Sequence, residues 1–457
     1  MKCRILYLFL FLFSCVLSAT RAAPQTIPVV STVPTSLPAT APATTYTRFI
    51  VRNPTGLASL QQLCLMLGCN VAGGIDGSLG KLFLVTAPSG IDPNAFLQTL
   101  RSQPGVTNAE LDALLKVMQS TAPAAPSGLG DSNPVDYFGT RGVWHGYVAQ
   151  PAGTIVRLPD TQYAFNATGA GIVADIDTGV DPNHPVLQPV LLPGYDFIRN
   201  QPNGSEMTDF TGAPPPPNST NIANVNQSTA AVLDQSTAAV LDAGPQYAAF
   251  GHGTMVAGII HLVAPTARIM PLKAFQADGT GYLSDILRAV YFAVQNGANV
   301  INMSFNLPTY SAEMAKAAKF AVHHQLICIA SAGNDGREEM VYPAGLASVM
   351  GVGSTANDDT RSTFSNYGDD LVWVAAPGEG VITTYPFGTY AAGWGTSFST
   401  PMVSGAAALL LSISADCNES CAEKSVAHAV PLSSDLGNGR LDLYQAVSYL
   451  RSSLSSP

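Results

Sequence analysis

The sequence predicts an α/β fold in which a parallel sheet is flanked by helices, preceded by a small α+β layer. Three observations lead to it. After residue 169, near-continuous runs of Val, Ile and Ala alternate with helical patterns, as in parallel sheets covered on both faces. Residues 46–117 show the order β-α-β-β-α-β, which is that of a ferredoxin-like layer of helices on an antiparallel sheet. The length of 457 residues, 47% of them hydrophobic, favours two or more domains.

The beginning of the chain is typical of an exported protein. Lys2 and Arg4 precede an apolar run over residues 5–17, and mostly small residues follow up to residue 23. Such a run is too short to span a bilayer, and it is typical of a secretory signal peptide. We therefore predict a signal peptide over residues 1–23, a Pro/Thr-rich spacer over 24–45, and secretion to the extracellular space or periplasm. A buried N-terminal helix and a lipoprotein cleavage site at Cys15 are the alternatives.

The charge and the cysteines of the chain indicate which partners and cross-links to expect. Only 11% of the residues are charged and the net charge is −10, so a nucleic-acid partner is not expected. Cys417 and Cys421 flank three residues and form a candidate disulfide in an exported protein, whereas the pairing of Cys64 and Cys69 stays open. Cys328 lies in an apolar strand, where a cysteine is typically a small buried hydrophobe.

The small layer is predicted as a domain over residues 46–118. Strands are expected over 46–52, 71–75 and 81–87, with a last strand within 106–117. One helix has its apolar face at Leu57, Leu60, Leu63, Cys64 and Leu67. A second begins at Asp92, a capping residue, followed by a proline suited to a first turn. Residues 119–136, rich in Ala, Pro and Gly, are predicted to be a linker and processing zone.

The main domain is predicted over residues 137–457. Strands are expected over 172–176, 268–275, 300–305, 326–331 and 349–353, and helices over 254–263, 284–296, 313–323 and 402–413. The helix at 402–413 is apolar but too short and too rich in Gly and Ala to span a membrane. An insertion over 211–245 contains four consecutive prolines and an octapeptide, 227–234, repeated identically at 235–242. We interpret it as a tolerated surface insertion, with a recognition arm as the alternative.

Four polar residues stand at the ends of apolar segments in this domain. Asp177 and Asn334 follow buried strands, and sites in open α/β sheets form at the carboxyl ends of strands. His252 lies in a Gly-His-Gly turn before a helix. Ser397 lies among small residues before a buried helix, whose first turn suits Pro401. A serine hydroxyl becomes a strong nucleophile only when a base takes its proton. Taken singly, each of the four also fits a structural role in a cap or turn.

These four segments, in the order Asp, His, Asn, Ser, resemble those of the subtilisin-like serine peptidases (subtilases) over roughly residues 137–450. The resemblance implies a triad of Asp177, His252 and Ser397, with Asn334 in the oxyanion hole. It also implies a substrate-pairing segment and a pocket wall, although the family usually has glycine where Asn306 stands. The expected substrate-binding residues are Ser304, Phe305, Asn306, Ser331, Ala332 and Gly333.

The small domain is similar to the subtilase pro-domain, which chaperones and inhibits the catalytic domain. The resemblance therefore implies a secreted endopeptidase made as a self-inhibited precursor, acting as a monomer on protein or peptide substrates. No cofactor is required for the chemistry. Calcium often binds subtilases, but no loop here shows regular ligand spacing, so no metal ligand is assigned.

Three alternatives stay open. An α/β-hydrolase esterase is disfavoured by the order of the triad and by the absence of a Gly-x-Ser-x-Gly elbow at Ser397. A catalytically silent binding or scaffold protein is the non-enzymatic alternative. The small domain could also be an unrelated module with a binding role.

Overall fold

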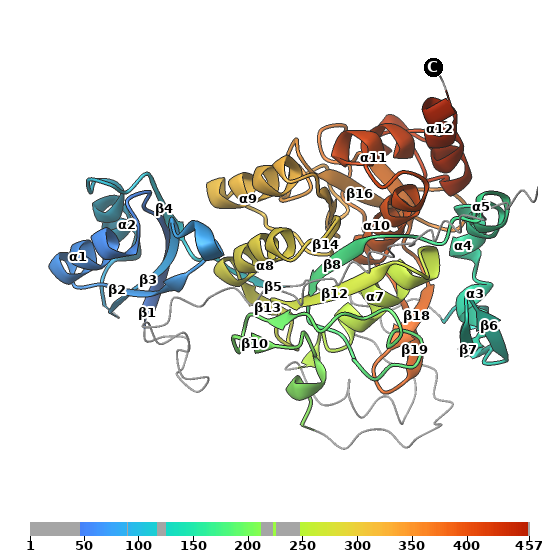
Figure 1. The fold of residues 1–457 in the computed structure, drawn as a ribbon, viewed down its shortest axis with the longest axis horizontal. Helices are drawn as coiled ribbons and strands as arrows, with labels where there is room; N and C mark the ends of the chain where they lie inside the picture. Colours follow the sequence, from blue (N-terminus) through green and yellow to red (C-terminus); the bar gives the residue numbers. More distant parts are fainter. Residues whose placement is uncertain (1–45, 89, 117–124, 212–222, 225–246, 456–457) are drawn as a thin grey trace, which may run out of the picture.

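The computed structural model describes residues 46–88, 90–116, 125–211, 223–224 and 247–455. The expected signal peptide and spacer, and the duplicated octapeptide of the insertion, lie outside the described residues. A small N-terminal module (residues 46–111) lies beside a larger main body (residues 125–455), as Figure 1 shows.

The N-terminal module is a four-stranded antiparallel sheet with the strand order β2-β3-β1-β4. Its element order is the β-α-β-β-α-β order expected from the sequence. Leu60 and Leu100 from the two helices share one buried core with Phe49 of the sheet. Asp92 begins α2 by accepting hydrogen bonds from two backbone N–H groups of the first turn. The elements are β1 (Tyr46–Arg52), α1 (Leu57–Leu67), β2 (Asn70–Gly74), β3 (Leu82–Pro88), α2 (Pro93–Arg101) and β4 (Asn108–Leu111).

The last strand of this module differs from the prediction. The expected strand within 106–117 is two strands, β4 and β5 (Leu114–Lys116). Asp112 stands between them, and its carboxylate accepts hydrogen bonds from the main body. The chain therefore leaves the module's sheet, and β5 pairs antiparallel with β13 (Thr280–Tyr282) of the main body.

The main body is built on an eight-stranded sheet. Its strand order is β10-β9-β12-β8-β14-β15-β16-β17. All neighbours are parallel except β9 and β10, which pair antiparallel at one edge. The prediction of a parallel sheet is wrong at this edge, because residues 197–200 are too short a connection for a parallel crossover. The strands are β8 (Ile172–Asp177), β9 (Tyr195–Asp196), β10 (Gln201–Pro202), β12 (Arg268–Lys273), β14 (Val300–Met303), β15 (Ile327–Ser331), β16 (Met350–Thr355) and β17 (Val374–Pro377).

Helices cover both faces of this sheet. Buried residues of α8 and α9 belong to one core cluster, and those of α7 and α10 belong to the other. Their bounds are α7 (His252–Val263), α8 (Leu283–Gln295), α9 (Ala312–His323) and α10 (Thr396–Ile413). The other elements are β6 (Pro134–Tyr137), β7 (Thr140–Trp144), α3 (His145–Val148), α4 (Pro151–Ile155), α5 (Leu158–Phe165), β11 (Ala223–Asn224), β18 (Val381–Tyr385), β19 (Thr389–Gly393), α11 (Glu419–Val426) and α12 (Leu443–Ser455), with short 3-10 turns η1 (Gly77–Leu79), η2 (Ser127–Gly130), η3 (Met207–Asp209) and η5 (Ser434–Leu436).

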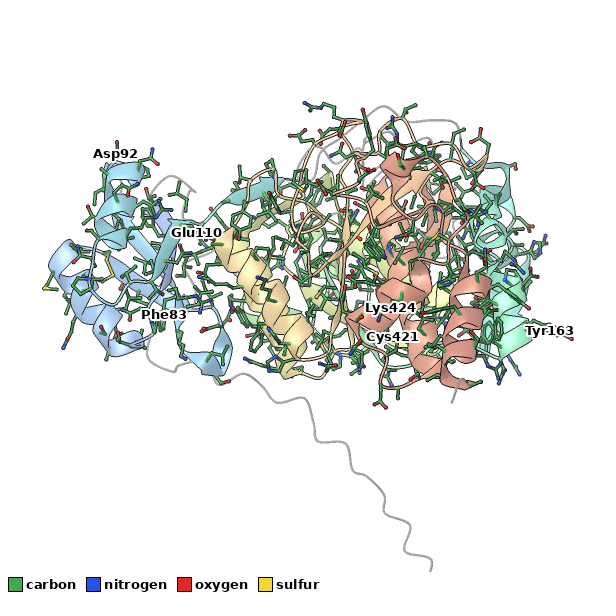
Figure 2. The ribbon with its side chains drawn as sticks, turned by 90° about the horizontal axis from the view of Figure 1, so that it is seen from above. Phe83, Asp92, Glu110, Tyr163, Cys421 and Lys424 are labelled. Carbon is green, nitrogen blue, oxygen red and sulfur yellow. A yellow bond between two sulfur atoms is a disulfide. The ribbon has the colours of Figure 1, made fainter. Side chains whose placement is uncertain are left out.

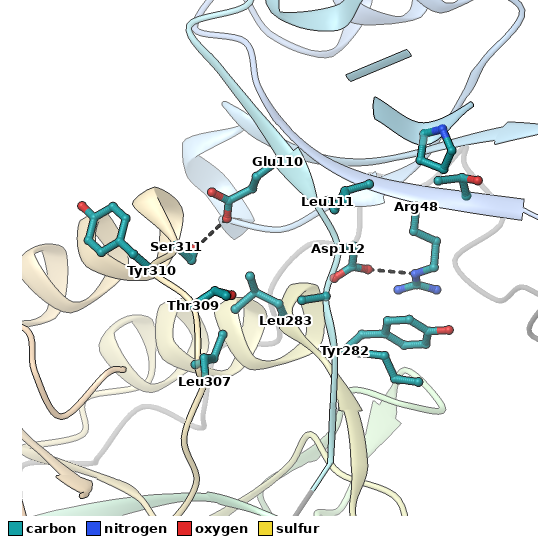
Figure 3. A pocket seen from close by; sticks show the side chains of 14 residues that line it. Arg48, Glu110, Leu111, Asp112, Tyr282, Leu283, Leu307, Thr309, Tyr310 and Ser311 are labelled. Carbon is teal, nitrogen blue, oxygen red and sulfur yellow. Dashed lines mark hydrogen bonds and ion pairs between the residues drawn. The ribbon is translucent and has the colours of Figure 1, made fainter. Parts of the chain in front are cut away.

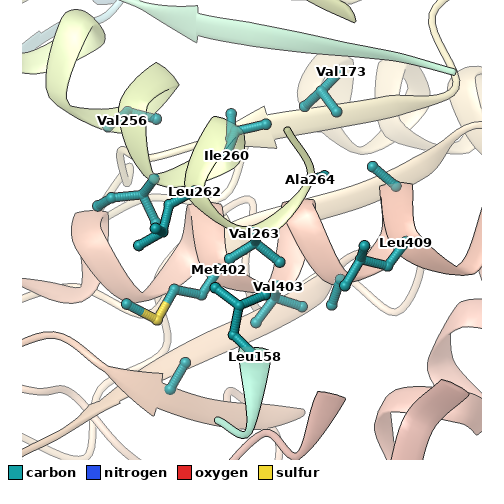
Figure 4. Packing of buried hydrophobic residues seen from close by; sticks show 14 of the residues in the cluster. Leu158, Val173, Val256, Ile260, Leu262, Val263, Ala264, Met402, Val403 and Leu409 are labelled. Atoms are coloured by element: carbon teal, nitrogen blue, oxygen red, sulfur yellow. The ribbon is translucent and has the colours of Figure 1, made fainter. Parts of the chain in front are cut away.

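The central helix α10 begins earlier than expected. It starts at Thr396, so Pro401 lies inside the helix, and the prediction that Pro401 occupies the first turn is wrong. Figure 4 shows α10 packed against α7. A Cβ on Gly405 would lie 2.5 Å from Cβ of Val263, so this glycine permits the close approach. Among the described residues, α10 is the one helix long and apolar enough to cross a membrane, but 89% of it is buried inside the molecule.

Part of the expected linker belongs to the main body. Leu129 of η2 is buried in the core that contains α7 and α10, and β6 pairs with β7. The described part of the zone 119–136 is therefore anchored by apolar burial rather than extended. Disulfides join Cys64 to Cys69 and Cys417 to Cys421. Cys328 is free and buried, as expected.

Candidate active site

The three expected catalytic side chains come from elements that meet at the carboxyl edge of the sheet. Asp177 is the last residue of β8, His252 the first residue of α7, and Ser397 the second residue of α10. Parallel pairing places β8 between β12 and β14, so Asp177 ends a central strand. Functional residues of open α/β sheets gather at this edge.

Asp177 and His252 form a hydrogen-bonded pair. His252 Nδ1 lies 2.7 Å from Oδ1 and 2.8 Å from Oδ2 of Asp177, and both side chains are almost fully buried. A carboxylate can only accept at this bond, which assigns the proton of neutral His252 to Nδ1. Nε2 is then an unprotonated acceptor, and it has no hydrogen-bond partner among the described residues.

Ser397 is held by a different acceptor from the one its expected role requires. Its Oγ donates to the backbone oxygen of Ser304 at 3.0 Å, so the described residues hold no Ser397–His252 hydrogen bond. In return, Ser304 Oγ donates to the backbone oxygen of Ser397 at 3.1 Å. That oxygen lacks its helical donor because Pro401 has no N–H. The expected triad would require rotation of the Ser397 side chain, and catalytic hydrogen bonds often tighten only when substrate binds.

Asn334 is oriented by the residue that precedes Ser397. Its Oδ1 accepts hydrogen bonds from N and Oγ1 of Thr396, each at 2.9 Å. Because both partners are donors, the atom facing Thr396 is the amide oxygen, and the NH2 group of Asn334 points away from Thr396. A Cβ on Gly395 would lie 3.3 Å from Asn334 Nδ2, so the amide donor lies beside the backbone leading to Ser397. An N–H donor here can stabilise a developing oxyanion.

The expected substrate-binding residues lie on two neighbouring segments. Residues 304–306 follow β14, and Ser331 to Gly333 end β15 and follow it; the two strands are paired. Ser304, Phe305, Ser331, Ala332 and Gly333 are buried, while Asn306 is half-buried. A Cβ on Gly333 would lie 3.1 Å from Asn306 Nδ2, which places the unexpected asparagine beside the predicted pocket wall.

Two buried acids near this site have no place in the expected motifs. Asp175 lies two positions before Asp177 on β8, and its Oδ1 accepts from Asn302 Nδ2 at 3.0 Å. Burial, and then the charge of Asp177, raise the pKa of Asp175 well above its usual value. Glu206 is fully buried and contacts the segments of both Asp177 and His252. The period of two in a strand places Asp175 on the same face as Asp177, whereas nothing in the sequence marks Glu206.

The described residues show no cluster of side chains typical of a metal site. They contain no group of three or more His, Cys, Asp or Glu side chains that could hold a metal ion. Calcium takes six to eight oxygen ligands, several of them usually carboxylates. No calcium ligands are therefore assigned, and the binding of a structural calcium ion stays a prediction.

Two acidic residues, one in the module and one directly after it, contact the beginnings of two main-body helices. Asp112 accepts from Ser284 N and Oγ, at 2.9 and 2.8 Å, in the first turn of α8. Glu110 accepts from Oγ of Ser311, the N-cap of α9, at 2.6 Å. Figure 2 shows Glu110 on the side of the module that faces the main body, whereas Asp92 lies farther from the main body. Negative charge is favourable at both helix N-termini.

A buried ion pair adds to this interface. Arg52 Nε donates to Glu313 Oε2 at 2.8 Å, and Asn108 Nδ2 donates to Oε1 at 2.8 Å. The Glu313 side chain is fully buried. A crevice of about 600 Å³ remains between module and main body, lined in part by Leu111 and Leu307 (Figure 3).

Comparison with known proteins gives consistent matches to the main body. The profile of the subtilase family matches residues 169–439. The chain is 30% identical over 313 residues to a thermophilic serine proteinase from Bacillus sp. (strain AK1), covering 67% of this chain and 68% of the relative. It is 32% identical over 306 residues to thermitase from Thermoactinomyces vulgaris, covering 64% and 94%.

Two further similarities are more limited. Subtilisin BL from Lederbergia lenta is 41% identical over 169 residues, which cover 35% of this chain and 62% of that relative. Among solved structures, the crystal structure of a lanthipeptide protease matches with a TM-score of 0.53 and 24% identity, covering 66% of this chain and 95% of that one. At this identity the structural match supports the fold alone.

Proposed function

The chain belongs to the subtilase family, and we propose that it is a secreted serine endopeptidase made as a self-inhibited precursor. The observation that carries the proposal is the buried Asp177–His252 pair with Nε2 open. Its partner would be the serine at the start of α10. A neutral imidazole held by a carboxylate can accept the proton of a serine hydroxyl, as acyl transfer requires.

The proposed reaction uses these groups in sequence. Ser397 Oγ turns from the Ser304 carbonyl toward His252 Nε2, transfers its proton there and attacks the scissile carbonyl carbon. The Asn334 amide and the Ser397 backbone N–H stabilise the oxyanion. His252 then protonates the leaving amine, and Asp177 stabilises the imidazolium. Water, deprotonated by His252, releases the acyl group.

Self-inhibition is supported by the path of the chain after the module. β5 adds to β13 as an antiparallel strand, in the manner of an extended peptide bound by β-augmentation. Leu115 of β5 is buried in the same core cluster as Phe275 and Leu283 of the main body. We propose that residues 46–118 act as the inhibitory pro-domain and that the precursor cuts itself between about residues 118 and 134. Export rests on residues 1–23 and fits a protein with two disulfides.

The experiment compares purified wild-type precursor with Ser397→Ala. Wild type should cut itself, hydrolyse casein and react with a fluorophosphonate at Ser397, whereas the variant should remain at full length and inactive. A variant that retained a tenth or more of wild-type kcat, free of contaminating peptidase, would refute the assigned nucleophile.

Three outcomes address the alternatives. Turnover of nitrophenyl esters without casein hydrolysis would favour an esterase, and an unlabelled, inactive wild type would favour a scaffold protein. A fully active wild type that keeps residues 46–118 covalently attached would refute the pro-domain assignment while leaving the peptidase assignment intact.

A further inference from the structure

Glu206 links the two segments that carry Asp177 and His252. It directly precedes η3 and is fully buried. Its Oε2 accepts hydrogen bonds from Thr178 Oγ1 at 3.0 Å and from Gly251 N at 2.7 Å. Thr178 follows Asp177, and Gly251 precedes His252, so one carboxylate oxygen joins the immediate neighbours of both residues.

The other carboxylate oxygen also accepts hydrogen bonds from one backbone N–H and one threonine hydroxyl, both belonging to Thr254 of α7. Glu206 Oε1 accepts from Thr254 N at 3.3 Å and also from Thr254 Oγ1. Each threonine hydroxyl in turn accepts a backbone N–H: Thr178 Oγ1 from Gly253 N at 2.9 Å, and Thr254 Oγ1 from Asp181 N at 2.8 Å. The hydroxyl protons are therefore directed to Glu206.

This arrangement requires an acceptor-only group at position 206. Each carboxylate oxygen faces one backbone N–H, of Gly251 or of Thr254, and a backbone N–H cannot reverse its role. A glutamine would place its NH2 group against one of these donors in either orientation. Only a carboxylate satisfies all the donors at once.

Charged and titratable groups surround Glu206 on several elements. Lys273 of β12 is fully buried, and its Nζ donates to Thr178 O and to Asp209 Oδ2, each at 2.7 Å. Asp177 and Asp175 lie on β8, His252 on α7 and Tyr385 on β18. Burial raises the pKa of Glu206 to about 7, while its hydrogen bonds and the charge of Lys273 act in the opposite direction. Near neutral pH the ionised form is therefore accessible.

We propose that Glu206 is a positioning residue for peptide hydrolysis, whose carboxylate fixes the segment of Asp177 to the segment of His252. The inference rests on the proposed peptidase function. Glu206 touches neither substrate nor the reacting atoms in this role. It keeps the imidazole aligned while the proton moves between Ser397 and the leaving group, so its loss should appear in kcat rather than in KM.

The test compares Glu206→Gln and Glu206→Asp with wild type. Glu419→Gln is the matched control, because Glu419 is another buried acid that accepts a backbone N–H, from Cys328 at 2.7 Å, away from this site. We expect kcat to fall by about 10- to 100-fold in Glu206→Gln, by analogy with the loss measured when groups that orient metal-binding residues are removed. The loss of kcat should be smaller in Glu206→Asp. In both Glu206 variants KM should stay within twofold of wild type, and the control should keep wild-type kcat.

The pH profile separates positioning from a general structural effect. Protonation of Glu206 should steepen the acidic limb of kcat/KM in wild type, and this extra proton dependence should disappear in Glu206→Gln. Wild-type kcat and an unchanged pH profile in folded Glu206→Gln would overturn the inference, as would an equal loss of kcat in the control.

A second variant covers the case in which Glu206→Gln does not fold. Thr178→Val removes one hydrogen-bond donor to Glu206; a loss of kcat in this variant supports the inference, and wild-type kcat overturns it. An inactive wild type would instead refute the proposed function.

Discussion

Ser304 and Ser397 are joined by two hydrogen bonds of opposite sense, each hydroxyl donating to the other residue's backbone oxygen. One bond replaces the helical donor that Pro401 cannot supply. The other holds the proposed nucleophile away from His252 Nε2. The segment expected to bind substrate therefore also fixes the resting position of the group expected to attack it.

Ser304→Ala should weaken both the fold and the reaction. The buried Ser397 carbonyl loses its side-chain donor, and an unsatisfied buried group costs about 1–3 kcal/mol. We expect that decrease in the free energy of unfolding, measured in urea, together with a lower kcat. Ser404→Ala is the control, because it removes another buried hydroxyl of the same network, bonded to Asn302 Oδ1 at 2.8 Å. A kcat loss of the same size in both variants would contradict the special role of Ser304.

Asn334→Asp separates the amide donor from the loop that it anchors. Aspartate keeps an oxygen to accept from Thr396 but has no NH2 group. We expect kcat to fall by about 10²–10³-fold, the cost known for an oxyanion-hole asparagine in a subtilisin. Asn438→Asp, at an exposed position, controls for the added charge. Nearly unchanged kcat in Asn334→Asp would remove this residue from the oxyanion hole.

Arg52→Ala should weaken the hold of the module on the main body. Truncating one partner of a buried, hydrogen-bonded charge pair typically costs about 2–5 kcal/mol of binding. After self-cleavage, the module should therefore dissociate at least tenfold faster, and activity should appear earlier. Lys81→Ala, on the exposed surface of the same module, should behave as wild type. Equal activation times for all three proteins would show that the Arg52–Glu313 pair does not contribute to inhibition.

Stability should depend on pH through Glu419. Burial raises the pKa of Glu419 to about 9, above the usual glutamate value of about 4.3. Between these values the unfolded chain has lost the proton that the folded chain keeps, so this group lowers the free energy of unfolding as pH rises. Glu419→Gln removes the effect, and its melting temperature relative to wild type should increase from pH 5 to pH 9. A constant difference across that range would contradict the shifted pKa.

Much of the central architecture could be predicted because local patterns and burial agree. The apolar run before Asp177 is β8, and the helix after His252 is α7, each within two residues of the expected bounds. The start of α10 could not be predicted, because a proline such as Pro401 is typical of the first turn of a helix. A proline is tolerated inside this helix since Ser304, 93 positions away, donates to the carbonyl left open.

The contacts that could not be predicted join segments that are far apart in the sequence and meet only in the folded protein. Glu206 lies 45 positions from Gly251 and belongs to no recognisable pattern. The sequence does not predict the partner of β5, which pairs with β13 because Asp112 ties the chain to the first turn of α8. Side chains that satisfy distant backbone groups leave no periodic signal in the sequence.

The burial of α10 also has a consequence for inactivation by heat. Every residue from Thr396 to Leu411 is buried, and such central segments open only with the whole domain, whereas surface segments open locally at lower cost. Ser397 lies in the first turn of this helix. We therefore expect activity to disappear along the global unfolding curve, without an earlier local step, so that residual activity after heating measures the fraction of molecules still native.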